Sequence, residues 1–414
     1  MLYNFDVAVI GAGPSGMMAG ISAKNTSNKV CILEKNHSAG KKLLISGKGR
    51  CNVTTSKEIS EIVSAFGKNG KFLYGSLTRF SNKDVINFFE SRKVILKEER
   101  GMRMFPVSDK SETILNCLLT ELNSKGVEMI YNFPVNTIIK TEHGFEITSK
   151  NKTINCKKLI IATGGKSYPE TGSTGDGYLF AKSLGHTIIS PIPALTPLIA
   201  GNKELVSLAG LTLKNVELSF MVNDEVHSKE FGEMLFTHKG ISGPIVLKLS
   251  RGVYEQLAMG NKVFANIDLK PKLDELTLRQ RIHKETLKAP KKEYQSLLAT
   301  LLPRLLITYT IKATTIDKHK QSSTLNREEV KKIINFLKHF RFEITGVESI
   351  KRAIVTHGGV PVEEINPKNM ESKITEGLFF AGEVICLDGP TGGFNMQKAF
   401  STGYVAGMSS SGSI

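Results

Sequence analysis

The stretch that decides the fold reads DVAVIGAGPSG and occupies residues 6–16. An apolar run, then closely spaced glycines, then small residues predict a strand, a tight turn and a helix. In such a βαβ opening the first glycine permits the turn, the second lets backbone approach a pyrophosphate, and the third lets the helix pack on the strand. The helix N-terminus then faces an anion. The predicted dinucleotide-binding residues are Gly11, Ala12, Gly13, Pro14, Ser15 and Gly16.

The next apolar run, VCIL at residues 30–33, ends at Glu34. A carboxylate about twenty residues beyond the glycine motif accepts hydrogen bonds from ribose hydroxyls. Because Glu34 would repel a 2′-phosphate, the adenosine bound here is not expected to be that of NADP.

Length and composition indicate a globular protein. The chain has 414 residues, 40% of them apolar, which is enough for a full core over two or three domains. No apolar run reaches the roughly eighteen residues of a membrane span, and the βαβ unit begins too early to leave room for a signal peptide. The five cysteines form no CxxC pair, which argues against a disulfide framework, a zinc site and a redox dithiol. We expect a cytoplasmic protein without a membrane partner or metal.

The net charge of +16 raises the question of nucleic acid. Residues 271–341 hold sixteen lysines and arginines against seven acidic residues, so this segment supplies +9 of the total. It lacks the aromatic residues interleaved with basic ones that stack bases. The pattern favours a solvated, lysine-rich helical surface over an RNA-binding face, which stays open as an alternative.

A loop dense in glycine, cations and small polar residues follows Glu34, at residues 37–54. This composition favours a loop whose amides surround a phosphate or a flavin ring over a helix or strand. Because the loop starts at the ribose-binding strand end, we expect Lys48, Arg50 and Asn52 beside the cofactor.

Short helices and strands are predicted up to residue 190. A capping box at 81–84 predicts a helix start, and a second helix is predicted over 112–124. A strand over 158–162 ends in Thr163-Gly164-Gly165, where backbone is expected to approach the cofactor again. The other predicted strands are 127–131 and then 135–139, 145–148 and 152–156, the last three as an antiparallel meander.

Three prolines between residues 191 and 197 indicate the exit into an inserted region. Apolar alternation predicts β structure up to residue 271, and helices dominate from 272 to 340. The last of these helices is predicted to have Asn326 as its N-cap, with Glu329 three residues on. Strands ending in glycine return at 353–360 and 377–383, followed by glycines that open a last helix. We therefore predict an α/β fold whose Rossmann-like domain, 1–190 and 350–414, is interrupted by a β-barrel-like subdomain, 191–271, and a helical subdomain, 272–349.

These motifs together resemble the BaiN-like or aminoacetone-oxidase-like family of bacterial FAD-binding flavoproteins, distant relatives of the fumarate reductase flavoproteins. The resemblance covers nearly the whole chain. It is carried by GAGPSG at 11–16, GKKLLISGKGRCNVT at 40–54, ATGGKSYPETGSTGDG at 162–177, LFTHKGISGP at 235–244 and GLFFAGEVICLDGPTGGFNMQKA at 377–399. The resemblance implies non-covalent FAD, although a covalent link through His37 or His357 stays open. The substrate-binding arginine and histidine set of the fumarate reductases does not align, so dicarboxylate reduction is not expected.

The site residues are expected to fall into two groups. Cofactor contacts besides the glycine motif and Glu34 are predicted at Lys35, Lys42, Ser46, Gly47, Gly49, Asn52, Val135, Ala162, Thr163, Gly164, Gly165, Gly382, Glu383, Gly392, Gly393, Phe394 and Asn395. Lys48 and Arg50 are expected to stabilise negative charge on the flavin or an anionic substrate. His238 is expected to offer a proton from the insert, and Tyr168 to shape the pocket.

The expected activity is hydride transfer between the flavin and a small organic substrate. We favour a reductase of an unsaturated or carbonyl-conjugated compound, with NAD(P)H as a transient donor because no second GxGxxG motif opens a βαβ unit. Two alternatives stay open, an amine oxidase of the aminoacetone type that releases peroxide and an RNA-modifying flavoprotein. Oligomeric state is left open.

Overall fold

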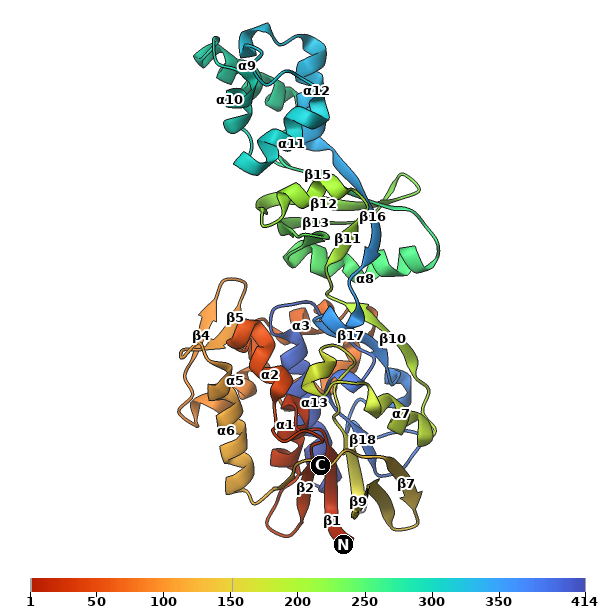
Figure 1. Ribbon diagram of the computed structural model, residues 1–414. Coiled ribbons are helices and arrows are strands. Elements are labelled where there is room, and N and C mark those ends of the chain that lie inside the picture. The colour runs from red at the N-terminus through yellow and green to blue at the C-terminus, as the bar shows by residue number, and fades with distance from the viewer. Residues whose placement is uncertain (1, 151, 414) are drawn as a thin grey trace. The chain divides into compact units, whose positions relative to one another are not determined.

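The structure is a computed structural model that describes residues 2–150 and 152–413. The chain divides into two compact units. The first combines Met1–Ala194 with Ile350–Ile414, and the second is Leu195–Ser349. Each is described separately below, with the element labels of Figure 1.

A seven-stranded sheet forms the centre of the first unit, in the order β6-β2-β1-β9-β8-β7, with β18 also paired to β9 (Figure 1). In this sheet Val9 lies opposite Ile32 on one side and Ile160 on the other, and Ile160 is also the partner of Phe379. All these pairings are parallel, as the βαβ motif predicts. The parallel strands are β1 (Leu2–Ile10), β2 (Val30–Leu33), β6 (Glu128–Ile130), β9 (Lys152–Ile161) and β18 (Leu378–Phe380).

Strand β9 differs from the sequence prediction. Two strands, 152–156 and 158–162, were expected, but β9 runs unbroken through Lys157 because β1 pairs with it on both sides of that residue. Its first half also pairs with β8 (Gly144–Ser149), which pairs with β7 (Thr137–Thr141). The predicted antiparallel meander is therefore confirmed, and its last strand continues into the parallel sheet.

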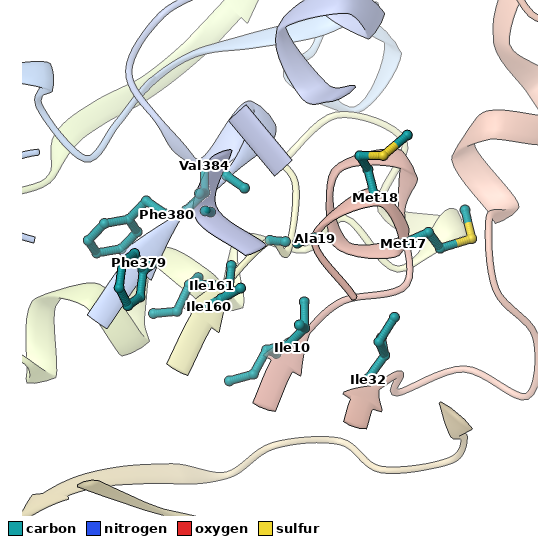
Figure 2. Close-up of a cluster of buried hydrophobic side chains, with 14 of the residues drawn as sticks. Ile10, Met17, Met18, Ala19, Ile32, Ile160, Ile161, Phe379, Phe380 and Val384 are labelled. Carbon is teal, nitrogen blue, oxygen red and sulfur yellow. The ribbon is translucent and has the colours of Figure 1, made fainter. Parts of the chain in front are cut away.

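Helices α1 (Pro14–Ala23) and α13 (Phe394–Ser410) pack against each other, so the first and last segments of the chain meet. Small residues make this approach close, since a Cβ on Gly403 would lie 2.3 Å from the Ser15 carbonyl oxygen. Figure 2 shows apolar side chains of the sheet beside α1, among them Ile10 and Ile32, and Phe380 farther along the sheet on β18. Burial on both faces explains why β2 and the last residues of β1 (7–10) and β9 (159–161) are continuous apolar runs.

The remaining elements of the first unit are short. Ser81 caps α5 as predicted, because its hydroxyl accepts from the Asp84 amide and the Asp84 carboxylate accepts from the Ser81 amide. Segment 40–54, expected to be a loop, instead contains α2, anchored by buried Leu43, followed by a 3₁₀ turn. The helices are α2 (Lys41–Ile45), α3 (Ile59–Ala65), α4 (Tyr74–Arg79), α5 (Asn82–Glu90), α6 (Ser111–Ser124) and α7 (Asp176–Ser183). Two small antiparallel sheets comprise β3 (Thr54–Thr55), β5 (Arg103–Pro106) and β4 (Leu96–Glu99), and β10 (Ile189–Ala194) with β17 (Val355–Gly359).

The second unit is a closed six-stranded barrel, β11-β14-β13-β12-β15-β16, with helices attached. The barrel confirms the predicted β-rich insert, but helix α8 was not predicted. The last barrel strand, β16, lies inside the range 272–349 that was expected to be helical. It alternates buried and exposed residues and pairs with β15, so the chain returns to the barrel after the helices. The strands are β11 (Leu198–Ala200), β12 (Thr212–Val222), β13 (Glu225–Phe236), β14 (Gly240–Ser242), β15 (Val263–Asp268) and β16 (Phe340–Val347).

The helices of the second unit follow β14 and β15. Helix α12 begins at a capping box formed by Asn326 and Glu329, as predicted. The helices are α8 (Pro244–Ala258), α9 (Glu275–Lys288), α10 (Tyr294–Ala299), α11 (Arg304–Thr314) and α12 (Arg327–Lys338). Over residues 2–150 and 152–413, no helix has the length and apolar character needed to cross a bilayer.

Candidate functional site

Four parallel strands end at the same edge of the sheet, and each is followed by a segment predicted to bind the cofactor. β1 ends before Gly11, β2 before Glu34, β9 before the segment 162–165, and β18 before Gly382 and Glu383. Ligands of open α/β sheets bind outside the carboxyl ends of the strands. The topology therefore brings together segments that are up to about 370 residues apart in the sequence.

The first turn has the geometry that the glycine motif requires. Gly11 has φ +102°, and a Cβ there would lie 2.6 Å from the Ala162 carbonyl oxygen. A Cβ on Gly16 would lie 1.9 Å from the Gly11 carbonyl oxygen, so this glycine lets α1 pack on the turn. By contrast, a Cβ on Gly13 would meet no atom within 4 Å. Gly13 thus borders open space at the start of a helix whose first residue is Pro14 and whose N-terminus is uncapped by any described side chain.

Glu34 is nearly buried beside this turn. One carboxylate oxygen accepts from the Ala12 amide at 3.0 Å, and the other accepts from the Asn36 amide at 2.9 Å. The second oxygen also accepts from the Asn36 side-chain amide at 2.7 Å, so the capacity for a ribose hydroxyl lies at the oxygen that binds Ala12. The Phe133 amide donates to the Glu34 carbonyl oxygen, and half-buried Val135 follows two residues later. Glu34 and Val135 thus lie in neighbouring segments, and a cofactor contact of Val135 stays a prediction.

Lys35, predicted as a cofactor contact, binds protein groups. Its ammonium lies 2.7 Å from the Asp176 carboxylate and also contacts the Thr174 hydroxyl. The pair ties the end of β2 to the start of α7. A direct cofactor contact of Lys35 stays a prediction.

Lys42 and Glu383 form an ion pair that connects α2 to the end of β18. The Lys42 ammonium lies 2.8 Å from one Glu383 oxygen and 2.7 Å from the Ser167 hydroxyl. The other Glu383 oxygen accepts from the Thr356 amide at 2.8 Å. Burial alone would raise the pKa of Glu383, but the Lys42 charge and these hydrogen bonds hold it below its ordinary value. The pair is ionised and joins two segments predicted to contact the cofactor.

The turn at 46–52 has an irregular backbone. Gly47, Lys48 and Gly49 all have positive φ, and Lys48 is exposed. The Ser46 hydroxyl donates to the Leu43 carbonyl oxygen, which fixes the entry to the turn. In the amide orientation that satisfies both of its polar atoms, the Asn52 oxygen accepts from the Gly393 amide at 2.9 Å. This bond brings the turn to the start of α13, as expected for two segments around one ring.

Arg50 was expected to face the cofactor, but its guanidinium contacts protein carboxylates. It lies 2.7 Å from Glu99 and 3.3 Å from Asp109, and it stacks 4.2 Å from the centre of the Phe105 ring. The bond to Glu99 raises the pKa of Arg50 and lowers that of Glu99. The pKa of Asp109 is lowered first by Lys97 and then by Arg50. The arrangement gives Arg50 a structural role on β4 and β5, and its predicted role toward a flavin or substrate remains a hypothesis.

The N-terminus of α13 is the second uncapped helix start at this edge. Gly392 and Gly393 have φ +124° and +96°, and Phe394 is buried behind them. The Asn395 side chain accepts from the Gly389 amide and donates to the Gly389 carbonyl oxygen, which closes the preceding loop. The helix amides provide partial positive charge for an electron-rich group.

The end of β9 supplies the other predicted backbone contacts. Ala162 is buried, Thr163 follows it, and Gly164 has φ +75°. A Cβ on Gly165 would lie 2.8 Å from the Glu383 carboxylate, so glycine lets the backbone of this segment pass close to that side chain. Tyr168 adopts a left-handed conformation, φ +51°, and is half-buried three residues later.

His238 lies in the second unit, in an exposed bend between β13 and β14. The other predicted site residues all belong to the first unit. Its role as proton donor therefore stays a prediction.

Sequence reasoning missed several polar interactions of the first unit. His357 pairs with Asp388 at 2.5 Å, and Thr356 beside it binds Glu383. Lys398 is buried in α13 and donates to the Leu387 carbonyl oxygen, and this burial lowers the pKa of Lys398 to about 8. The sequence offered one indication of His357: it directly precedes the two glycines at the end of β17, and strand ends with glycines were the segments predicted to approach the cofactor.

Comparison with known proteins places this site in a family. The model of the HI0933-like protein Rossmann domain matches residues 5–409. The chain belongs to that family. Its relatives include the 3-dehydro-bile acid delta(4,6)-reductase of Clostridium scindens, which is 30% identical over 97% of this chain and 98% of its own length. The ribosomal RNA dihydrouridine synthase of Haemophilus influenzae is 29% identical over 97% of each chain.

Solved structures show the same fold. An open flavocytochrome c3 fumarate reductase gives a TM-score of 0.52 at 18% identity, over 99% of this chain and 78% of the other. The 3-ketosteroid-delta4-(5alpha)-dehydrogenase of Rhodococcus jostii gives 0.51 at 16% identity, over 99% and 97%. The family assignment makes this chain an FAD-dependent oxidoreductase.

The residues at the sheet edge fit FAD. The open space beside Gly13, the uncapped start of α1 and the carboxylate of Glu34 suit a pyrophosphate and an adenosine ribose. The start of α13 suits the electron-rich edge of a flavin ring. No group of His, Cys, Asp and Glu residues that could hold a metal occurs in the described part of the chain.

Proposed function

We propose that this protein saturates a carbon–carbon double bond conjugated to a carbonyl group, with NAD(P)H as the transient electron donor. The observation that carries the proposal is a chemistry common to two relatives matched over almost their full length. One is named for removing the 4,6 double bonds of a 3-dehydro bile acid, and the other for producing dihydrouridine. In each case the double bond is conjugated to a carbonyl.

FAD, when bound, supplies the hydride chemistry of this reaction. The chain would hold its pyrophosphate at the start of α1 and its ribose at Glu34. The amides at the start of α13 would stabilise negative charge on the ring, a preorganised interaction that costs no rearrangement during reaction. Exposed Lys48 would attract an anionic substrate, and Tyr168 would border the pocket.

An anaerobic titration tests this function. NADH and then NADPH are added to the flavin-loaded protein while the visible flavin band is followed, and a 3-oxo-4,6-diene steroid acid is then added. We expect bleaching by one nucleotide and recovery of the band together with a product lacking a double bond. A band that neither nucleotide bleaches would contradict the donor. Recovery with oxygen alone, with peroxide formed from aminoacetone, would support an oxidase instead.

A second candidate substrate is a uracil base in RNA, favoured by the charge of the second unit. Residues 271–341 carry +9, and relatives from Haemophilus influenzae and Escherichia coli are named ribosomal RNA dihydrouridine synthases. Helix α12 exposes Lys331 and Lys332 and buries Ile333 and Ile334, so its lysines face outward. A basic exposed face attracts phosphates independently of sequence.

Filter binding of a ribosomal RNA fragment over a salt series tests the second candidate. We expect tight binding at low salt that weakens steeply as salt rises. The double variant K331A/K332A should bind more weakly, with the salt slope reduced by about 0.7 for each lost single-strand phosphate contact. The control K68A/K71A removes two exposed lysines of the first unit. No retention at low salt, or equal loss in both variants, would contradict RNA binding.

A further inference from the structure

The first unit contains two histidine–carboxylate pairs with different surroundings. His186 has both ring nitrogens engaged, Nδ1 with Glu364 at 2.8 Å and Nε2 with Ser372 at 2.8 Å. Its side chain is 0% exposed and stands edge-on against Phe380. Burial lowers the pKa of His186 despite the nearby carboxylate. This pair is enclosed in the core and has a structural role.

His357 forms the second pair and keeps contact with solvent. Its Nδ1 lies 2.5 Å from a carboxylate oxygen of Asp388, whose side chain is only 9% exposed. The His357 side chain is 27% exposed. A carboxylate at Nδ1 fixes the orientation and the tautomer of an imidazole, with the proton of the neutral ring on Nδ1. Nε2 is then the nitrogen that takes up and releases the second proton, the one that the imidazolium carries.

The pair lies among the segments predicted to surround the cofactor. His357 follows Thr356 on β17, and Thr356 binds both Glu383 and the Lys166 amide, each at 2.8 Å. Asp388 precedes Gly389, which the Asn395 side chain ties to the start of α13. The pair therefore connects β17 to the loop before α13, at the sheet edge where four strands end (Figure 1).

We propose that His357 donates the proton that completes reduction of the conjugated double bond, and that Asp388 is the positioning residue that holds it. The inference rests on the proposed function. FAD, when bound and reduced, would supply the hydride for the β-carbon, and the π electrons of the substrate would move onto its carbonyl as an enolate. The Nε2 proton of the His357 imidazolium then forms the α-carbon C–H bond. The neutral imidazole regains a proton from water, to which the ring is exposed.

Two kinds of electron acceptor separate proton donation from electron transfer: conjugated compounds, whose reduction needs a proton on carbon, and ferricyanide, whose reduction does not. Protein reduced under anaerobic conditions is mixed in a stopped-flow instrument with the 3-oxo-4,6-diene steroid acid, with a uridine-containing ribosomal RNA fragment, or with ferricyanide. We expect His357→Gln to slow recovery of the flavin band with the conjugated acceptor by at least about 100-fold, as for loss of a general acid. Recovery with ferricyanide, which forms no C–H bond, should not change. Asp388→Asn should show the same pattern to a smaller extent.

His186→Gln is the matched control, because it removes a histidine that is also paired with a carboxylate. We expect it to lower thermal stability and to leave recovery with both kinds of acceptor unchanged. His238→Gln is tested alongside, since His238 is the rival donor. If His238→Gln slowed recovery of the flavin band with the conjugated acceptor and His357→Gln did not, the proposal would be overturned.

A spectroscopic readout tests the pair without turnover. In the oxidised, flavin-loaded protein, the proton shared by His357 and Asp388 should give a far-downfield imidazole NMR signal that is lost in His357→Gln and Asp388→Asn and kept in His186→Gln. Equal rates for wild type and His357→Gln with a conjugated acceptor would overturn the assignment of His357 as proton donor, but not the proposed function. If ferricyanide reoxidised the wild-type protein but neither conjugated compound did, the proposed function would be contradicted, and the role of His357 as proton donor would be contradicted with it.

Discussion

Single polar side chains connect the strand ends of the candidate site. Glu34 joins the first turn to the segment after β2, and Glu383 joins β18 to α2 and β17. Glu34 was predictable because its position follows from a local motif. The partners of Glu383 were not, since Lys42 is 341 residues away and meets it only through the topology of the sheet.

Replacing Glu34 tests its role toward ribose. Glu34→Gln keeps the shape but removes the charge, and a hydrogen bond to a charged group contributes about 1.5–3 kcal/mol. We expect FAD affinity to fall about tenfold or more, measured by titrating flavin-free protein with FAD and following fluorescence. The exposed Glu142→Gln is the control. Unchanged affinity in Glu34→Gln would show that the carboxylate does not contact the cofactor.

The Lys42–Glu383 pair predicts a pH-dependent stability. Lys42→Met leaves a mostly buried carboxylate without its cation, and we expect a loss of about 1–3 kcal/mol of unfolding free energy near pH 7. Because Lys42 lowers the pKa of Glu383, its contribution is present above the unfolded pKa of the carboxyl group and is lost as pH falls through the folded pKa. The difference between wild type and variant should therefore shrink on acidification. Urea unfolding of the flavin-free proteins over a pH series measures it.

The pair of half-buried Lys57 and exposed Glu61, at 2.6 Å beside the start of α3, is the control for this prediction. Solvent screens such a pair, so Lys57→Met should unfold at nearly the same urea concentration as wild type at every pH. A Lys42→Met deficit that stays constant on acidification would contradict the assigned ionisation of Glu383.

At the scale of elements, the sequence predicted best where local chemistry decides. The turn after β1, the caps of α5 and α12 and the glycine-rich start of α13 depend on nearby residues. Strand extents were predicted less well, because they depend on distant partners. β9 is continuous since β1 pairs along it, and β16 belongs to the barrel since β15 pairs with it.

Alanine substitutions of two glycines in the first turn should have different effects, one on FAD affinity and the other on stability. Gly13→Ala places a methyl group in open space, so the flavin-free protein should unfold at the wild-type temperature, while FAD affinity falls about tenfold or more because the methyl occupies the pyrophosphate position. Gly16→Ala forces a methyl to within 1.9 Å of the Gly11 carbonyl oxygen and should cost about 1–3 kcal/mol of stability. Thermal unfolding and FAD titration of both variants measure this. Equal loss of stability would contradict the different surroundings of the two residues.

At the scale of the whole molecule, the chain leaves the first unit at Ala194 and returns at Ile350. All predicted cofactor contacts lie in the first unit, whereas the basic segment 271–341, with a net charge of +9, lies in the second. The composition of the sequence was enough to locate the basic segment 271–341 and the prolines near the point where the chain leaves the first unit. It could not show that β10 and β17 pair, with Ala194 opposite Val355, because their residues are about 160 positions apart.

This pairing predicts that the first unit can be closed without the second. Replacing residues 195–349 with a short Gly/Ser linker should give a protein that binds FAD within about tenfold of the full chain, measured by the flavin absorption band and fluorescence titration. Ala194 ends β10, and Ile350 lies five residues before its partner strand β17 begins at Val355, so a short linker costs little closure entropy. Adding Gly13→Ala to the shortened chain should remove the flavin, because the retained cofactor would lie at the first turn. A shortened chain that folds but takes up no FAD would show that the second unit is required for the cofactor site.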